Sequence, residues 1–204
     1  MTYSDFTTLA VALEAFKLTA TSRPLFAGLT PVDPPPWLAA LLARQLTRPY
    51  SRGNEKARSE FLIAPTLAGV DELSAGQVTL YSGETLSVDQ AAGLSGECDF
   101  LFGGDAAAVL LQAPLLAVAE AKRADIDLGA GQAVAQMVGV RAYNERAGRP
   151  TPVVGGCVTT GEAWQFLRLD GSVVSFDDRR YFITELGSVL AAFLALLAQA
   201  RGAA

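Results

Sequence analysis

Apolar residues along the chain recur at two spacings, and these predict both helices and strands. Helical spacing predicts helices over 5–21, with Ser4 or Asp5 as N-cap, and over 37–46, 127–146 and 185–201. A further helix is expected over 53–63, beginning at Asn54 and limited by Pro65. Strand-like stretches cover 77–81, 97–102, 115–122, 153–159, 163–169 and 173–176, the last as an edge strand. Together these elements predict an α/β (α+β) fold with a central mixed β-sheet flanked by helices.

The segments between these elements predict one domain spanning 1–204. Five prolines within 23–36 predict a connecting loop, and residues 82–84, 87–96 and 160–162 are expected to form a turn, a connector and a hairpin turn. A chain of 204 residues, half of them hydrophobic, is long enough for one well-packed core. We expect an N-terminal helical accessory segment over 1–50, a core over 53–176 and a C-terminal helix over 185–201.

The C-terminal helix carries a long apolar face that must be covered. We expect self-association as a homodimer, or the N-terminal helix, to cover it. Its apolar run, Val189 to Ala198, is shorter than the roughly 20 residues that span a bilayer, so no membrane contact is expected. Cys98 and Cys157 are isolated and predict buried free thiols in a reducing, cytoplasmic setting.

Charge narrows the classes of function. The net charge of −5 and pI near 4.8 exclude a broad nucleic-acid-coating surface, so any such contact must be local. One local basic segment is a candidate for nucleic-acid binding, although solvated helix faces would look the same; its residues are Arg44, Arg48, Arg52, Lys56 and Arg58. The absence of histidine excludes Ser-His-Asp and Cys-His catalysis and histidine-based zinc sites.

Three charged residues interrupt two apolar strand-like stretches in the middle of the chain. Glu120 and Lys122 project to the same side of a strand because side chains alternate. If the two stretches pair antiparallel with Asp99 opposite Glu120, the Cβ atoms lie about 5 Å apart. Such carboxylates repel unless a cation lies between them, and Mg²⁺ typically takes one or two carboxylates. With a lysine to orient or deprotonate a water, the pattern predicts metal-assisted phosphodiester hydrolysis.

A rival carboxylate stands two residues before Asp99. Alternation places Glu97, Asp99 and Leu101 on one face of the strand and Cys98, Phe100 and Phe102 on the other. Asp99 is favoured over Glu97 because it lies deeper in the apolar stretch.

The order of these residues resembles the PD-(D/E)XK nuclease superfamily, which has a restriction-endonuclease-like fold. Asp99 is followed by Glu120-Ala121-Lys122 and then by a helix that bears Gln132. The upstream helix at Asn54 resembles the family's first core helix, which carries an acidic residue into the site. Two departures stand out: Cys98 rather than Pro precedes Asp99, and Gln136 stands where many relatives with a Gln-x-x-x-Tyr helix have Tyr.

The resemblance implies a core of αβββαβ order and a metal-dependent endonuclease acting on DNA, with RNA left open. Asp99, Glu120 and the Ala121 carbonyl would hold Mg²⁺ or Mn²⁺, Lys122 would position the attacking water, and Gln132 would support the site. Glu55 would bind a metal-linked water or a second ion. Glu60 is the alternative, but five residues turn a helix by about 500°, so only one of the two can face the metal.

Two other functions compete with this interpretation. A nuclease-like fold can also serve as a noncatalytic nucleic-acid-binding or assembly module, which a measured metal affinity would separate from an enzyme. The pair Gly129 and Gly131 suggests a dinucleotide-binding loop, but the third glycine of that motif is missing.

Overall fold

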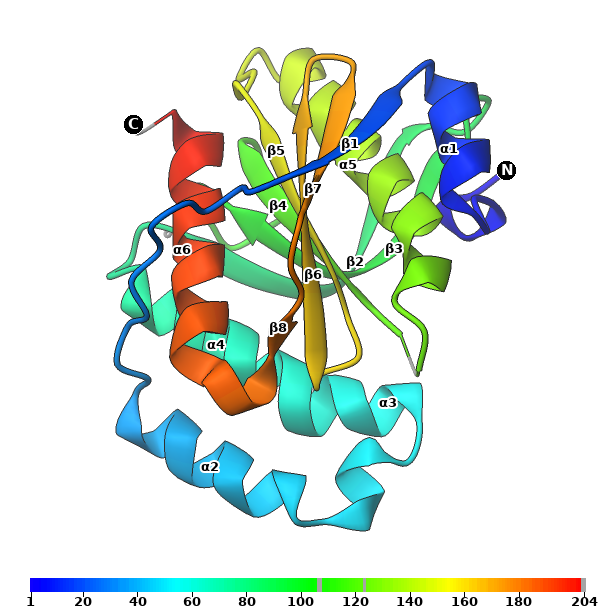
Figure 1. Ribbon diagram of the computed structural model, residues 1–204. Coiled ribbons are helices and arrows are strands. Elements are labelled where there is room, and N and C mark those ends of the chain that lie inside the picture. Colours follow the sequence, from blue (N-terminus) through cyan, green and yellow to red (C-terminus); the bar gives the residue numbers. More distant parts are fainter. Residues whose placement is uncertain (106–107, 123, 203–204) are drawn as a thin grey trace.

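The computed structural model describes residues 1–105, 108–122 and 124–202 of the chain. These residues form one eight-stranded sheet with helices on both faces (Figure 1). The strand order is β1-β7-β6-β5-β4-β3-β2, and β8 pairs with β6. The pairs β1–β7 and β4–β5 are parallel and the others antiparallel. The predicted α/β fold with a central mixed sheet is therefore confirmed.

The strands follow the predicted apolar stretches, with two additions near the termini. Their bounds are β1 Thr19–Arg23, β2 Thr79–Asp89, β3 Leu94–Gly103, β4 Leu115–Ala121, β5 Val154–Thr159, β6 Ala163–Asp170, β7 Val173–Asp177 and β8 Tyr181–Phe182. Every residue of β4 and of β5 is buried, as expected for central strands covered on both faces.

The helices include several short turns. The α-helices are α1 Leu9–Phe16, α2 Pro36–Leu46, α3 Glu55–Arg58, α4 Ala64–Leu73, α5 Ala130–Arg146 and α6 Leu186–Arg201. The shorter turns are η1 Tyr3–Asp5, η2 Pro49–Arg52, η3 Ser59–Ile63, η4 Asp127–Gly129 and η5 Ile183–Glu185. The predicted helices over 37–46, 127–146 and 185–201 are thus confirmed within a few residues.

Two apolar clusters fill the space between the sheet and its two helical layers. One cluster lies under α2, α4 and α6, and its centre is Phe193, whose ring contacts those of Phe102, Trp164 and Phe166. The other lies under α1 and α5. Figure 1 shows α6 and α5 on opposite sides of the sheet. Burial of each large side chain contributes about 1.5–3 kcal/mol, so both layers stabilise the sheet.

The prediction of a single helix over 5–21 was wrong. Thr8, not Ser4 or Asp5, caps α1, because its hydroxyl oxygen accepts a hydrogen bond from the Val11 amide. Lys17 then adopts a left-handed conformation with φ of 52° and ends the helix. The following β1 extends the sheet beyond β7, so β7 is not the edge strand that was predicted. The N-terminal segment is therefore not purely helical.

Pro65 does not limit the helix that begins at Asn54. The Asn54 side chain caps α3 as predicted, by accepting from the Ala57 amide at 2.8 Å. The helical path then passes through a π-type turn, η3, in which the Ala64 amide donates to the Ser59 carbonyl, and it continues as α4. Proline is tolerated there because it occupies the first turn of α4, where local hydrogen bonding is already altered.

The turn expected at 82–84 and the connector over 87–96 were also wrong. Both lie inside a long hairpin in which β2 runs to Asp89 and β3 begins at Leu94. The pairing between these strands skips Gly83 and Asp99, and Gly83 has φ of 70°. Regular alternation would place Cys98 and Phe100 on one face of β3. Instead, Cys98 packs with Leu101 on the α5 side, and Phe100 packs on the α6 side.

The C-terminal helix packs against other elements of the chain but not against the N-terminal helix α1, and self-association stays a prediction. The apolar side of the C-terminal helix packs on α4, β4 and β5, whereas the N-terminal helix α1 packs on α5. Among the described residues, the stretch Ile183–Arg201 is long and apolar enough to cross a membrane, by length and composition alone. Half of it is buried inside the protein, as in the core helix of a globular domain.

Candidate active site

The candidate residues gather midway along β3 and at the end of β4. Phe100 pairs with Ala119, so the same register continued by one residue places Asp99 opposite Glu120, as predicted. The Ala121 amide donates a hydrogen bond to Asp99 Oδ2 at 2.8 Å. Beyond β4, the Lys122 amide donates a hydrogen bond to the Thr159 carbonyl of β5. This hydrogen bond holds the chain at the point where it leaves the sheet.

Glu120 is the most deeply buried of these residues, with 1% of its surface exposed. Its Oε1 accepts a hydrogen bond from Lys122 Nζ at 2.5 Å, and its Oε2 accepts one from Gln136 Nε2 at 2.8 Å. Lys122 Nζ also donates to Gln132 Oε1 at 3.3 Å. Glu120 and Lys122, which were predicted to project to one side of the strand, are in contact, and α5 supplies two amides that hold the pair.

Asp99 lies in a cleft of about 370 Å³ between α3 and the β2–β3 hairpin. The cleft lining comprises Glu55, Lys56, Ser59, Ser82, Gly83, Glu97, Asp99 and Ala121. Neither Glu120 nor Lys122 belongs to this lining, so the two predicted carboxylates do not share one open surface. Asp99 and Ala121 form the wall of the cleft nearest to the buried Glu120–Lys122 pair.

The structure separates the acidic residues that sequence alone left as rivals. Glu55 lines the cleft with Asp99, whereas Glu60 is directed to an ion pair with Lys56 at 3.3 Å. Glu97 also lines the cleft, but it is exposed, whereas Asp99 is half-buried. Of the two helix glutamates, Glu55 therefore has the position expected for a supporting acid.

The protonation of the site follows from its burial. Burial raises the pKa of Glu120 to about 7, the charge of Asp99 adds to the rise, and Lys122 and Gln136 oppose it. Burial also raises the pKa of Asp99; the Ala121 amide and Lys122 oppose this rise, and Glu55 and Glu97 add to it.

Lys122 remains an ammonium in this setting. Burial by itself would lower its pKa, but the Glu120 carboxylate, with Glu55 and Asp99, raises the pKa above its ordinary value. A lysine that stays protonated at neutral pH can donate hydrogen bonds but cannot remove a proton from water. Of the two roles expected for Lys122, orientation of a water fits the structure better than deprotonation.

Gly129 and Gly131, which suggested a dinucleotide-binding loop from the sequence, have a packing role. A Cβ on Gly129 would meet Val158 Cγ1 at 2.6 Å and Lys122 Cγ at 2.9 Å. A Cβ on Gly131 would collide with the backbone carbonyls of Phe6 and Thr8. These glycines let the start of α5 approach β5 and the N-terminal segment, and the first of them lies directly against the stem of Lys122.

Gln136 contacts the site in a way that the sequence did not reveal. From the sequence, Gln132 and Gln136 share a helix face and were expected to hold phosphate oxygens or a metal-bound water, or to pack, whereas Gln136 is fully buried and donates to Glu120. Its Oε1 has no hydrogen-bond partner among the described residues, which is costly for a buried amide. A glutamine in an otherwise apolar and alanine-rich helix face was the available signal.

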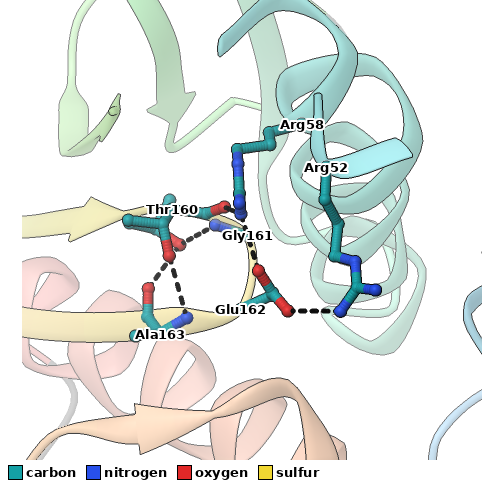
Figure 2. A network of polar contacts seen from close by, with 7 residues as sticks. Arg52, Arg58, Thr160, Gly161, Glu162 and Ala163 are labelled. Carbon is teal, nitrogen blue, oxygen red and sulfur yellow. Dashed lines mark hydrogen bonds and ion pairs between the residues drawn. The ribbon is translucent and has the colours of Figure 1, made fainter. Parts of the chain in front are cut away.

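The basic segment does not form a continuous free surface. Figure 2 shows that Arg52 and Arg58 converge on Glu162, at the turn between β5 and β6. The ion-pair distances are 3.2 Å and 2.8 Å, and Arg58 also donates to the Thr160 carbonyl at 2.9 Å. Lys56 is paired with Glu60, which leaves Arg44 and Arg48 as the exposed cations outside these pairs within this segment.

We expect Glu162→Gln to lower the free energy of unfolding by about 0.5–1 kcal/mol at neutral pH, because Arg58 is mostly buried. Hydrogen bonds from Arg58 and then Arg52 outweigh burial and lower the pKa of Glu162. Its stabilising effect is therefore present above the ordinary carboxyl pKa and disappears as the pH falls through the lowered value. Urea unfolding at neutral and strongly acidic pH measures this difference.

Glu60→Gln is the matched control, because it breaks the exposed pair with Lys56. No measurable change is expected from it. Equal losses in the two variants would show that the Glu162 network does not hold the β5–β6 turn to the helical segment.

The geometry thus brings Asp99, Glu120, Ala121, Lys122 and Gln132 together, places Glu55 across the cleft from them, and leaves part of the basic segment in ion pairs. Among the described residues, no group of three or more acidic or thiol side chains is arranged to hold a metal ion. No protein-family model, curated protein or solved structure matches this chain.

Proposed function

We propose that this protein is a metal-dependent nuclease that hydrolyses phosphodiester bonds in DNA. The observation that carries the proposal is the contact of 2.5 Å between the buried Glu120 and the partly buried Lys122, beside Asp99 at the end of β4. A buried carboxylate and ammonium whose pKa values depart from their ordinary range are typical of functional sites. An open cleft adjoins this pair, and the pKa of Asp99, which lines the cleft, is also raised by burial.

The finer fold assignment belongs to the same proposal. From α3 to β5 the chain runs through a helix, three strands, a helix and a strand. This is the αβββαβ order of the restriction-endonuclease-like core, and it supports membership of the PD-(D/E)XK superfamily.

The donor set fits a Mg²⁺ or Mn²⁺ ion held by few protein ligands. Mg²⁺ usually keeps several waters and takes one or two carboxylates, so a set of three acids is not required. Asp99 Oδ1 accepts no hydrogen bond from the described residues, and Asp99 lies at the cleft beside Ala121. Asp99 and Ala121 line the cleft, and Glu120 would join them as a ligand once its carboxylate exchanges its hydrogen bonds with Lys122 and Gln136 for the ion. Asp99, Glu120 and the Ala121 carbonyl would then hold the ion, which would supply charge neutralisation and activation of water when bound.

The remaining residues act on substrate and solvent. The ammonium of Lys122 donates hydrogen bonds and can orient a water at the phosphorus, while Gln132 keeps that ammonium in place. Glu55 lies across the cleft and can accept a hydrogen bond from a second water. Gln136 preserves the orientation of Glu120 when Lys122 turns toward substrate.

A nuclease assay on plasmid and single-stranded DNA, with Mg²⁺, Mn²⁺ or EDTA, tests the function. We expect cleavage with either metal and none with EDTA. Absence of both cleavage and metal binding at millimolar Mg²⁺ or Mn²⁺ would favour the noncatalytic module instead. Arg44 and Arg48 would then be the first positions to test for nucleic-acid binding.

Metal affinity should fall as the pH is lowered below 7. Glu120 has a pKa of about 7, and only its ionised form binds a metal, so the ion must displace a proton in acidic solution. The loss should approach about tenfold per pH unit, which Mn²⁺ titrations at roughly pH 5.5 and pH 8.5 can measure. Circular dichroism at both pH values confirms that the protein stays folded. Equal affinities would contradict the raised pKa.

A further inference from the structure

A second polar pocket lies at the far end of β4 from the candidate active site. Its volume is about 460 Å³, and it is bounded by the start of β4, the loop after α5 and the end of α6. Arg149 and Arg201 are the charged residues that line it, and no carboxylate does so among the described residues. The seven residues of β4 span about 20 Å, so one phosphate cannot reach both sites.

Both guanidinium groups are anchored in a way that leaves donors free. Arg149 Nη1 donates to the Ala113 carbonyl at 2.8 Å. Arg201 Nη1 donates to the carbonyl and side-chain oxygens of Gln77 at 3.0 and 2.9 Å. Each guanidinium has five N–H donors, so most of them remain available. Neither arginine forms an ion pair within the described part of the chain.

The rest of the pocket supplies a further donor and a stiff wall. Thr151 Oγ1 accepts a hydrogen bond from Asn144 Nδ2 at 3.3 Å, which leaves its own proton to be donated. Pro114, Pro150 and Pro152 line the same pocket. Because proline has a fixed φ, this wall loses little conformational entropy when a ligand binds.

Arg149 and Arg201 are exposed, lie outside the ion pairs of the described residues and line one pocket, so they give this pocket a positive charge. The planar fork of arginine matches the oxygens of a phosphate group. We propose that the Arg149–Arg201 pocket binds a phosphate group, distinct from the phosphodiester at the candidate active site. The group can belong to a small phosphorylated molecule or to the terminus of a nucleic acid.

Inorganic phosphate is the probe for this site, in thermal-shift titrations at constant ionic strength and in EDTA. We expect a saturable rise in the melting temperature of the parent protein. Arg149→Gln and Arg201→Gln should each weaken apparent phosphate binding by at least about tenfold, since each removes charge-assisted donors. Thr151→Val keeps the charge and the approximate shape, and it should weaken binding by a few fold.

Arg141→Gln is the matched control. Arg141 also donates through Nη1 to a backbone carbonyl, that of Gly171, but it lies outside the pocket. Its variant should bind phosphate as the parent does. The proposal is overturned if the parent shows no saturable shift, or if all the arginine variants respond as the parent does.

A competition experiment distinguishes the two sources of the phosphate. A 5′-phosphorylated oligonucleotide should displace phosphate more effectively than the same unphosphorylated oligonucleotide if a nucleic-acid end occupies the pocket. Absence of competition by both oligonucleotides would point to a small phosphorylated molecule. Both results keep the site, whose existence rests on the phosphate titration, and neither depends on nuclease activity.

Discussion

Lys122→Ala should reduce DNA cleavage by about 10²–10⁴-fold while leaving metal affinity unchanged or slightly increased. Among the described residues, the Lys122 ammonium group is the only donor that reaches both Glu120 and Gln132. Removing it also removes a positive charge close to the metal ligands, which favours cation binding. Single-turnover cleavage rates and Mn²⁺ titrations measure the two effects separately.

Lys56→Ala provides the control for this variant. Lys56 lines the same cleft but is exposed and paired with Glu60. Its replacement by alanine therefore removes one positive charge, as Lys122→Ala does, but at a position that is not paired with Glu120. Lys56→Ala should cause only a small increase in KM for DNA. If Lys122→Ala cleaves DNA as fast as the parent, the proposed chemistry is wrong.

Asp99→Asn should abolish detectable metal binding and cleavage together. Asparagine can still accept the hydrogen bond from the Ala121 amide, so the fold is retained while the negative charge is lost. The same variant should raise the melting temperature of the metal-free protein at pH 8. Burial raises the pKa of Asp99, so its stability contribution is present at low pH and is lost as the pH rises above that value. The neutral amide avoids this loss.

Glu97→Gln is the control that decides between the two acids of β3. Glu97 lines the same cleft but is exposed, so its neutralisation should change neither metal affinity nor cleavage more than about twofold. Isothermal titration with Mn²⁺ and the plasmid assay on both variants give the comparison. The assignment of Asp99 fails if Glu97→Gln has the larger effect.

Local sequence signals predicted the elements that position the candidate site. The Asn54 cap, the apolar run of β4 and the periodicity of α5 each depend on neighbouring residues, so sequence was sufficient for them. The register that sets Asp99 opposite Glu120 was assumed from the sequence, and the observed pairing of Phe100 with Ala119 is in that register.

Contacts between distant segments explain what the sequence could not predict. The strand β1 exists because β7 lies beside it, although the two are separated by most of the chain. Glu162 binds Arg52 and Arg58 although more than 100 residues separate it from them in the sequence. These ion pairs leave fewer free cations in the basic segment. The orientation of Glu120 toward α5 rather than the cleft depends on Gln136, whose partner no local pattern identifies.

The π-type turn at Ser59–Ile63 has a consequence for how this chain should be aligned with others. A hydrogen bond that closes over five residues rather than four accommodates one residue more than a regular helical turn does. A homologous helix without this turn would place the acidic residue that corresponds to Glu55 one position closer to the proline that corresponds to Pro65. An alignment that forbids a one-residue gap between these positions would therefore match that acid to Lys56, and a gap placed within 59–63 restores its correspondence to Glu55.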